Sequence, residues 1–107
     1  MSLAEGFSVD DMVDMLEVCT GAGYTRENVL LAGERIWNME RLFNLKVGIT
    51  KADDTLPSRF LKEPMPEGPA KGRVSQLETM LPQYYEIRGW TPDGVPSPDK
   101  LRQLGLQ

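Results

Sequence analysis

Apolar residues recur at helical spacing near the start of the chain. Those on one face are Val9, Met12, Val13, Leu16 and Cys19, while the acidic residues lie on the other. Ser8 followed by Asp11 resembles a capping box, and Gly21 supplies a stop. The pattern predicts a helix over residues 9–20, with its acidic face toward solvent.

A second and longer helical pattern runs over residues 26–46. Thr25 can cap this helix, and Gly48 offers the left-handed residue that ends it. Its apolar positions cover more than one stripe, so it is predicted to be a central core helix or to pack against something outside the chain. Gly33, in its interior, predicts close approach by another helix.

Residues 49–73 are predicted to be irregular because prolines have no backbone N–H to donate. They are Pro57, Pro64, Pro66 and Pro69. A short helical turn is predicted over residues 56–61, with Pro57 at its first position. Phe60, Leu61 and Met65 are too apolar for a free linker. We therefore predict a long proline-rich loop that is docked against the rest of the fold.

The last third of the chain predicts further helices and no strand. Ser75 with Glu78 reads as a capping box, Pro82 predicts a kink or a restart near Leu81, and Gly89 ends the helix. Ser97 caps a last helix over residues 98–104, with Pro98 at its first position and Gly105 after it. The predicted fold class is a small all-α domain of about four to five helices.

Composition narrows the possible functions. The chain has 107 residues, enough for one domain, and 12 Lys+Arg against 16 Asp+Glu give a net charge of −4. This acidity argues against nucleic acid as a partner. One cysteine and no histidine argue against a self-sufficient enzyme, and no apolar run is long enough for a membrane helix. Residues 1–3 resemble a cloning remnant, although a natural start is equally compatible, and residues 4–107 form the predicted domain.

Asp53 and Asp54, with Arg59 nearby, form the most site-like cluster. Paired carboxylates can bind a divalent cation, but adjacent residues rarely converge on one ion and no further ligands follow at workable offsets. We therefore favour a turn role, with Asp54 or Thr55 capping the turn at Leu56. We expect no cation with both carboxylates in its first coordination shell.

The remaining candidates are more simply structural. The basic stretch Gly68 to Arg73 lacks the spacing of a phosphate loop and is predicted to be a docked basic loop. Cys19 is predicted to be a small buried hydrophobe. Core or interface packing is predicted for the aromatic residues Trp37, Tyr84, Tyr85 and Trp90, and a plain surface role for Arg41, Lys46 and Lys51. No catalytic, cofactor-binding or metal-binding residue is therefore assigned to this chain.

Several blocks of sequence resemble the C-terminal part of the aldehyde:ferredoxin oxidoreductases, which are tungsten-pterin enzymes. The similarity covers about residues 20–107, in order and with family-like spacing. It is carried by residues 33–44 (GERIWNMERLFN), Gly48, residues 53–57 (DDTLP), Arg59, Pro64, Gly68, Gly72, Tyr84, Tyr85, residues 88–90 (RGW), Gly94, Pro96, Lys100, Leu101, Gly105 and Leu106.

The resemblance implies a much longer parent enzyme that oxidises aldehydes to carboxylic acids. In that family a bis-pterin tungsten (or molybdenum) cofactor performs the reaction, and electrons leave through a four-iron, four-sulfur cluster to ferredoxin. The cluster's Cys-x-x-Cys-x-x-x-Cys run is absent from this chain, and Cys19 is not expected to be a ligand.

The implied role is that of a non-catalytic helical portion of a cytoplasmic enzyme. Its partners would be the remaining domains, with no nucleic acid and no membrane, and the segment 50–60 is expected to shape the substrate channel. The alternative is a free-standing helical protein-interaction module. A small metal or nucleotide protein has only Asp53, Asp54 and residues 68–72 in its favour.

Overall fold

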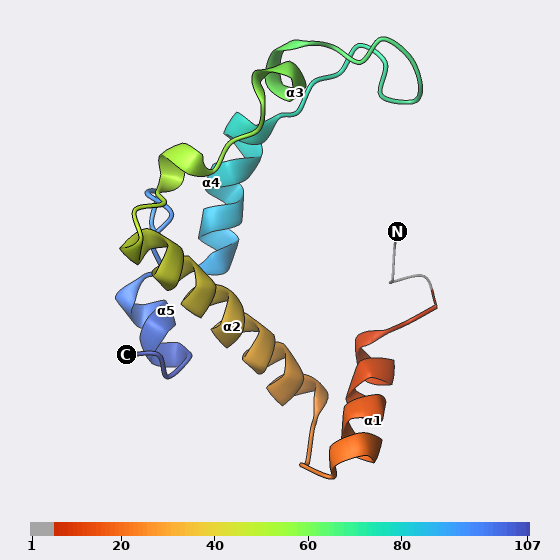
Figure 1. Cartoon of the computed structure of the whole chain (residues 1–107), viewed down its shortest axis with the longest axis vertical. Coiled ribbons are helices and arrows are strands. Elements are labelled where there is room, and N and C mark those ends of the chain that lie inside the picture. Colours follow the sequence, from red (N-terminus) through yellow and green to blue (C-terminus); the bar gives the residue numbers. More distant parts are fainter. Residues whose placement is uncertain (1–5) are drawn as a thin grey trace. The chain divides into compact units, whose positions relative to one another are not determined.

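The computed structural model describes residues 6–107, so the expected remnant at residues 1–3 lies outside the described part. The helices are α1 (Val9–Thr20), α2 (Arg26–Lys46), α3 (Ser58–Lys62), α4 (Leu77–Arg88) and α5 (Pro98–Gln103), with a 3₁₀ turn, η1 (Lys51–Asp53) (Figure 1). Over residues 6–107 there is no strand, only isolated bridges between Met65 and Lys71 and between Trp90 and Pro96. The all-α prediction is confirmed. None of the helices described is long and apolar enough to span a membrane.

Two compact units divide the chain, one ending at Asn38 and the other spanning Met39–Gln107. In the first unit α1 begins with the predicted capping box. The Ser8 hydroxyl accepts from the Asp11 backbone N–H at 3.1 Å, and the Asp11 carboxylate accepts from the Ser8 N–H at 2.8 Å. Gly21 closes the helix in the left-handed region, at φ 63°. The predicted bounds of α1 are confirmed.

The start of α2 is fixed by a reciprocal cap. The Thr25 hydroxyl accepts from the Asn28 N–H at 3.2 Å, and the Asn28 side chain accepts from the Thr25 N–H at 2.8 Å. The predicted bounds of α2 are therefore confirmed, with Asn28 as an unforeseen second half of the cap.

Two predictions for the first unit are wrong. Cys19 is exposed, as is Val18 beside it, and α1 has no buried residue, so this helix has no core in which a cysteine could be buried. Within the first unit nothing lies within 4 Å of a Cβ built on Gly33, so no other described helix of this unit approaches it closely.

The core of the second unit forms where α4 turns into the segment before α5. Its buried apolar side chains are Tyr85, Trp90 and Leu104, and Tyr84 meets Trp90 edge-on at 5.7 Å between ring centroids. Gly89 ends α4 at φ 71°, as predicted. The Ser97 hydroxyl accepts from the Lys100 N–H at 3.1 Å and Pro98 opens α5, which confirms the predicted cap.

The predicted start of α4 is wrong. Gln76 precedes the helix without any side-chain cap, because the Ser75 N–H donates to the Phe60 carbonyl at 2.8 Å and keeps Ser75 in the returning loop. The helix also continues through Pro82 and does not restart near Leu81. Proline lacks an N–H and leaves one carbonyl a turn earlier without its helical partner, a local cost that α4 tolerates.

The proline-rich loop closes on itself instead of docking. The Met65 N–H donates to the Arg73 carbonyl at 3.0 Å, and the Gly72 N–H donates to the Met65 carbonyl at 2.8 Å. Phe60 and Met65 remain largely exposed, as do residues 68–73, so the predicted docking of this loop and of its basic stretch is not made within the second unit. Pro57 precedes α3 as its N-cap, one position earlier than predicted. Within this unit α3 and the loop lie at the N-terminal end of α4, away from α5 (Figure 1).

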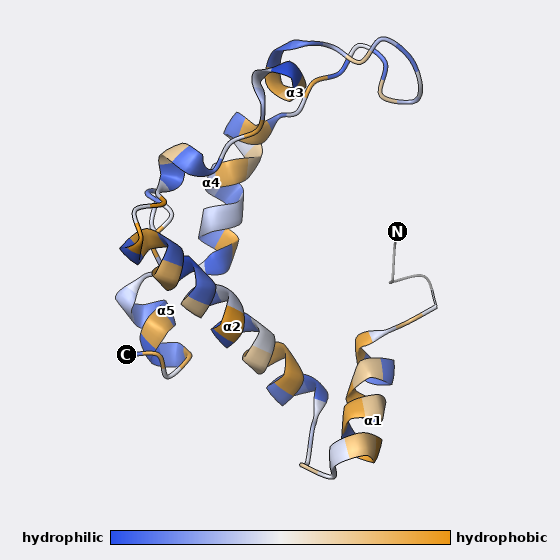
Figure 2. Cartoon of the chain, viewed as in Figure 1, coloured by the Kyte–Doolittle hydropathy of each residue, from blue (hydrophilic) through white to orange (hydrophobic). Residues whose placement is uncertain are grey.

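Apolar side chains remain exposed in both units. Figure 2 shows that hydrophobic residues recur along α2. Val18 is 86% exposed, Phe43 65% and Ile87 83%. Trp37 is also exposed, so much of the apolar surface of α2 is left uncovered by the described residues. Large exposed apolar surfaces on a monomer usually mark interfaces.

The purified chain is therefore expected to self-associate. Sedimentation velocity across a hundredfold concentration range should show weight-average mass rising with concentration. Replacing Val18, Phe43 and Ile87 together by Lys should shift association to higher concentration without loss of helical circular dichroism, because these side chains are exposed. A monodisperse monomer at millimolar concentration would contradict this expectation.

A candidate functional site around Arg41

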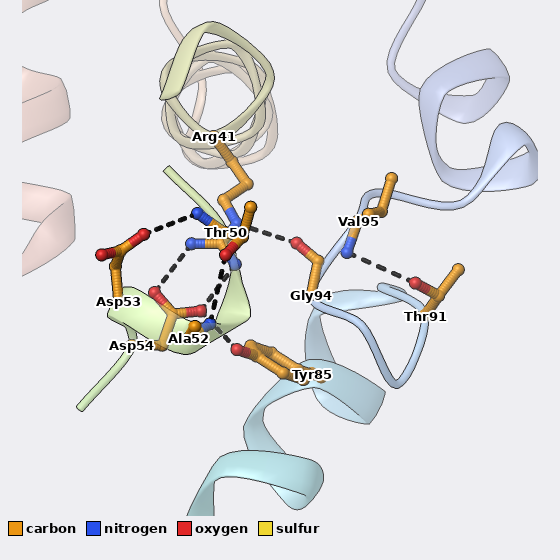
Figure 3. Close-up of polar contacts among 9 residues, drawn as sticks. All are labelled: Arg41, Thr50, Ala52, Asp53, Asp54, Tyr85, Thr91, Gly94 and Val95. Atoms are coloured by element: carbon orange, nitrogen blue, oxygen red, sulfur yellow. Dashed lines mark hydrogen bonds and ion pairs between the residues drawn. The ribbon is translucent and has the colours of Figure 1, made fainter. Parts of the chain in front are cut away.

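One buried cation organises the polar interior of the second unit. Arg41 lies on α2, Asp54 follows η1, Tyr85 lies on α4, and Gly94 lies in the turn before α5 (Figure 3). We call these four residues, together with Trp90, the Arg41 cluster. All five belong to the second unit, and they bring together segments that are far apart in the sequence.

The Arg41 guanidinium is bound on two sides. One nitrogen donates to Asp54 Oδ1 at 2.8 Å and another to Oδ2 at 2.6 Å, which is a bidentate pair. Arg41 Nε donates to the Gly94 carbonyl at 2.8 Å. The side chains of the pair are only 9% and 22% exposed, so the pair is shielded from water far better than an ordinary surface ion pair.

Aromatic rings form the walls of the cluster. The guanidinium carbon lies 5.1 Å from the Trp90 ring centroid and 6.0 Å from that of Tyr85, within the range of cation–π attraction. The Tyr85 hydroxyl donates to Asp54 Oδ2, the same oxygen that Arg41 binds. Asp54 is thus shared between a cation and a phenol.

Short local motifs hold Asp54 and Gly94 in place. The Thr50 hydroxyl accepts from the Ala52 N–H at 3.4 Å, and Asp53 accepts from the Thr50 N–H at 2.9 Å, which forms the capping box of η1. The Gly94 turn is closed by a bond from its N–H to the Thr91 carbonyl at 2.8 Å. A Cβ on Gly94 would lie 2.4 Å from the Arg41 guanidinium and 2.9 Å from the Tyr85 ring, so only glycine fits there.

The neighbouring carboxylates of Asp53 and Asp54 therefore have different structural roles. Asp53 caps η1, whereas Asp54 pairs with Arg41. The predicted cap by Asp54 or Thr55 is therefore wrong, since no side chain caps the short helix α3 that follows Leu56. Arg59 pairs with Glu63 at 3.5 Å instead of joining Asp53 or Asp54. Among residues 6–107 no group of three or more His, Cys, Asp and Glu side chains is placed to hold a metal.

The environment shifts the pKa values of Asp54 and Tyr85 in opposite directions. The hydrogen bond from Arg41 holds the pKa of Asp54 below its usual value, although burial opposes this. Burial raises the pKa of Tyr85 to about 12, and its bond to the Asp54 carboxylate adds to the shift. Asp54 therefore stays ionised and Tyr85 protonated at neutral pH, so this closed network has no acid or base poised near 7.

The predictions for the aromatic residues and for Arg41 have different outcomes. Tyr85 and Trp90 are core residues, as the aromatic pattern predicts, while Trp37 is exposed. Arg41, expected to be a plain surface residue, is instead buried. Its only sequence signal was a position among the apolar residues of a long helix, next to Leu42.

Fold and site together define a class: a small all-α domain whose polar interior is organised around a largely buried ion pair. The chain belongs to the aldehyde ferredoxin oxidoreductase family, since the family model described as "Aldehyde ferredoxin oxidoreductase, domains 2 & 3" matches residues 1–106. The resemblance in the sequence is thereby confirmed.

Several named proteins are similar to this chain. A tungsten-containing aldehyde ferredoxin oxidoreductase of Pyrococcus furiosus is 56% identical over 102 residues, which are 94% of this chain. The protein of the same name from Thermococcus kodakarensis is 55% identical over 102 residues. An aliphatic sulfonate oxidoreductase, WOR-like subunit, of Pyrococcus furiosus is 35% identical over 82 residues. The chain spans 17% of the length of the first two proteins.

Removing the Asp54 charge should destabilise the second unit. Asp54→Asn leaves a buried guanidinium without its counter-ion and is expected to cost about 2–3 kcal/mol, less than the roughly 3–5 found for fully buried pairs because Asp54 keeps some exposure. Asp53→Asn is the matched control, with an expected cost below about 1 kcal/mol. Urea unfolding followed by tryptophan fluorescence measures both, and equal losses would contradict the assignment.

The fit around Gly94 can be separated from backbone strain by a second glycine. Gly94 and Gly105 have similar φ values, 73° and 68°, but nothing lies within 4 Å of a Cβ on Gly105. Gly94→Ala should therefore cost about 1–3 kcal/mol more than Gly105→Ala, from overpacking alone. Equal thermal midpoints for the two variants would show that Arg41 and Tyr85 do not form the close cradle described.

Alkaline pH should weaken the fold through Tyr85. Its pKa is about 12 in the folded chain against 10.0 for a free tyrosine, so the folded state holds the phenolic proton more tightly. The stabilisation is complete below pH 10 and is lost as the pH rises from about 10 to about 12. Urea titrations at pH 9–11.5 should show a steeper loss of stability for the wild type than for Tyr85→Phe. Parallel slopes would contradict the shift.

Proposed function

We propose that this chain is a non-catalytic helical portion of a tungsten (or molybdenum) bis-pterin aldehyde:ferredoxin oxidoreductase. The observation that carries the proposal is the family match over residues 1–106 together with 54–56% identity to tungsten-containing aldehyde ferredoxin oxidoreductases. In the parent enzyme, an aldehyde would be oxidised to a carboxylic acid and its two electrons passed through a four-iron, four-sulfur cluster to ferredoxin.

The residues of this chain do not fit the cofactors of such an enzyme. A four-iron cluster takes about four thiolates, and the chain has one cysteine, Cys19, which is exposed on α1. The Arg41 guanidinium, a natural partner for phosphate, is already occupied by Asp54 and the Gly94 carbonyl. In the proposal, other parts of the parent hold tungstopterin and the cluster.

In the proposed enzyme, this chain holds a loop segment in position. The Arg41 cluster ties η1 to α2 and α4 and so fixes where the segment 50–60 leaves the core. We propose that this segment shapes the substrate channel of the parent, and that the remaining domains are the direct partners of the chain. We further propose that the parent is cytoplasmic, which is supported by the fit of an iron–sulfur enzyme with an unpaired thiol to a reducing compartment.

The division of labour can be tested on the isolated chain and on the parent. Reconstituted anaerobically with iron, sulfide and tungstate, the isolated chain should hold no stoichiometric cluster and reduce no dye with an aldehyde. The parent, purified under the same conditions, should contain tungsten and iron and oxidise aldehydes.

Two results would overturn the proposal. A stable brown cluster on the isolated chain would contradict the non-catalytic role. A coding sequence without any further domain or cysteine run would favour the free-standing interaction module instead.

A further inference from the structure

An open apolar groove lies between α3 and the returning arm of the proline-rich loop. It has a volume of about 790 Å³ and belongs wholly to the second unit. Its walls are mostly apolar, with Leu56, Phe60, Pro64, Met65, Pro66 and Val74 among the lining residues. Phe60 is 57% exposed, so this surface is not covered by any other described part of the chain.

The groove is preformed by the backbone. One wall is tied to the other by the bond from the Ser75 N–H to the Phe60 carbonyl at 2.8 Å. The loop beyond is closed by the pair of bonds between Met65 and residues 72–73. Prolines at 57, 64 and 66 restrict the chain further. A binding surface held in this way loses little conformational entropy when it is filled.

Charge around the groove differs from charge in the rest of the chain. Residues 59–73 hold four basic and two acidic side chains, while the whole chain carries −4. Of the charged residues that line the groove itself, Arg59 and Arg73 are basic and Glu63 is acidic, which leaves a net positive charge. The ion pair of Arg59 with Glu63 is 3.5 Å long and highly exposed, so it leaves Arg59 able to meet a second carboxylate.

We propose that the groove seats an apolar segment of the remaining polypeptide of the parent enzyme, with a carboxylate of that segment facing Arg59 and Arg73. This inference rests on the proposed function. Relatives 54–56% identical to the chain share only 17% of their length with it, so most of their polypeptide lies outside the matched region. A carboxylate suits the locally positive rim, and apolar side chains suit the walls.

The first test compares hydrogen exchange in two contexts. In the isolated chain, amides of residues 56–75 that make no internal bond should exchange rapidly, whereas in the parent they should exchange at least tenfold more slowly. Equal rates in both contexts would overturn the proposal. Protection in the isolated chain that grows with its concentration would overturn it in favour of a second copy.

A second test uses substitutions within the parent. Phe60→Asp should restore fast exchange of residues 56–75, and Arg59→Glu with Arg73→Glu should do so in part. Val47→Asp is the matched control, since Val47 is 59% exposed and does not line the groove. Circular dichroism of the isolated variants checks folding, which should be unchanged because Phe60 is exposed. Wild-type protection in the groove variants, or equal loss in the control, would overturn the proposal.

Tungsten content and aldehyde oxidation are measured on the same parent samples. A protected groove in a parent without tungsten or activity would overturn the proposed function while supporting the docking surface. An active tungsten enzyme whose groove amides exchange freely would support the proposed function and overturn the docking surface.

Discussion

The second unit depends on keeping one guanidinium out of water. Burying a cation costs several kcal/mol unless its charge and all its donors find partners. Arg41 finds them in the Asp54 carboxylate, the Gly94 carbonyl and two aromatic rings. Because such a pair contributes little net stability over an apolar core, we interpret its role as conformational specificity: the unit has one arrangement in which Arg41 is satisfied, and η1, α4 and the turn at Gly94 must all adopt it.

Local signals in the sequence were enough to place most helices. The capping residues Ser8, Thr25 and Ser97 and the left-handed glycines at 21 and 89 define ends that agree with the structure, because these motifs act within a few residues. Ser75 failed as a cap because a bond to the distant Phe60 carbonyl competes for it. A tertiary bond of that kind leaves no trace in local spacing.

The site itself was harder to predict. Periodicity assigns burial to apolar positions, yet on α2 the buried side chains are the polar Asn38 and Arg41, while Trp37 and Phe43 face solvent. Asp54 was recognised as notable but for the wrong chemistry, since its partner lies 13 residues earlier and Tyr85 lies 31 residues later. Exposed apolar residues on α2 and in the groove are consistent with a chain whose natural neighbours are other domains. A hydrophobic pattern shows that a surface will be covered, but not by what.

The bond from Arg41 to Gly94 joins positions 53 residues apart, and this separation has a consequence for biosynthesis. A ribosome adding about 5–20 residues per second makes Gly94 several seconds after Arg41. During that interval the helix around Arg41 can form, but its guanidinium has to remain hydrated. The interior of the second unit can therefore close only after the turn at Gly94 has left the exit tunnel, which makes it a late event in the maturation of the nascent chain.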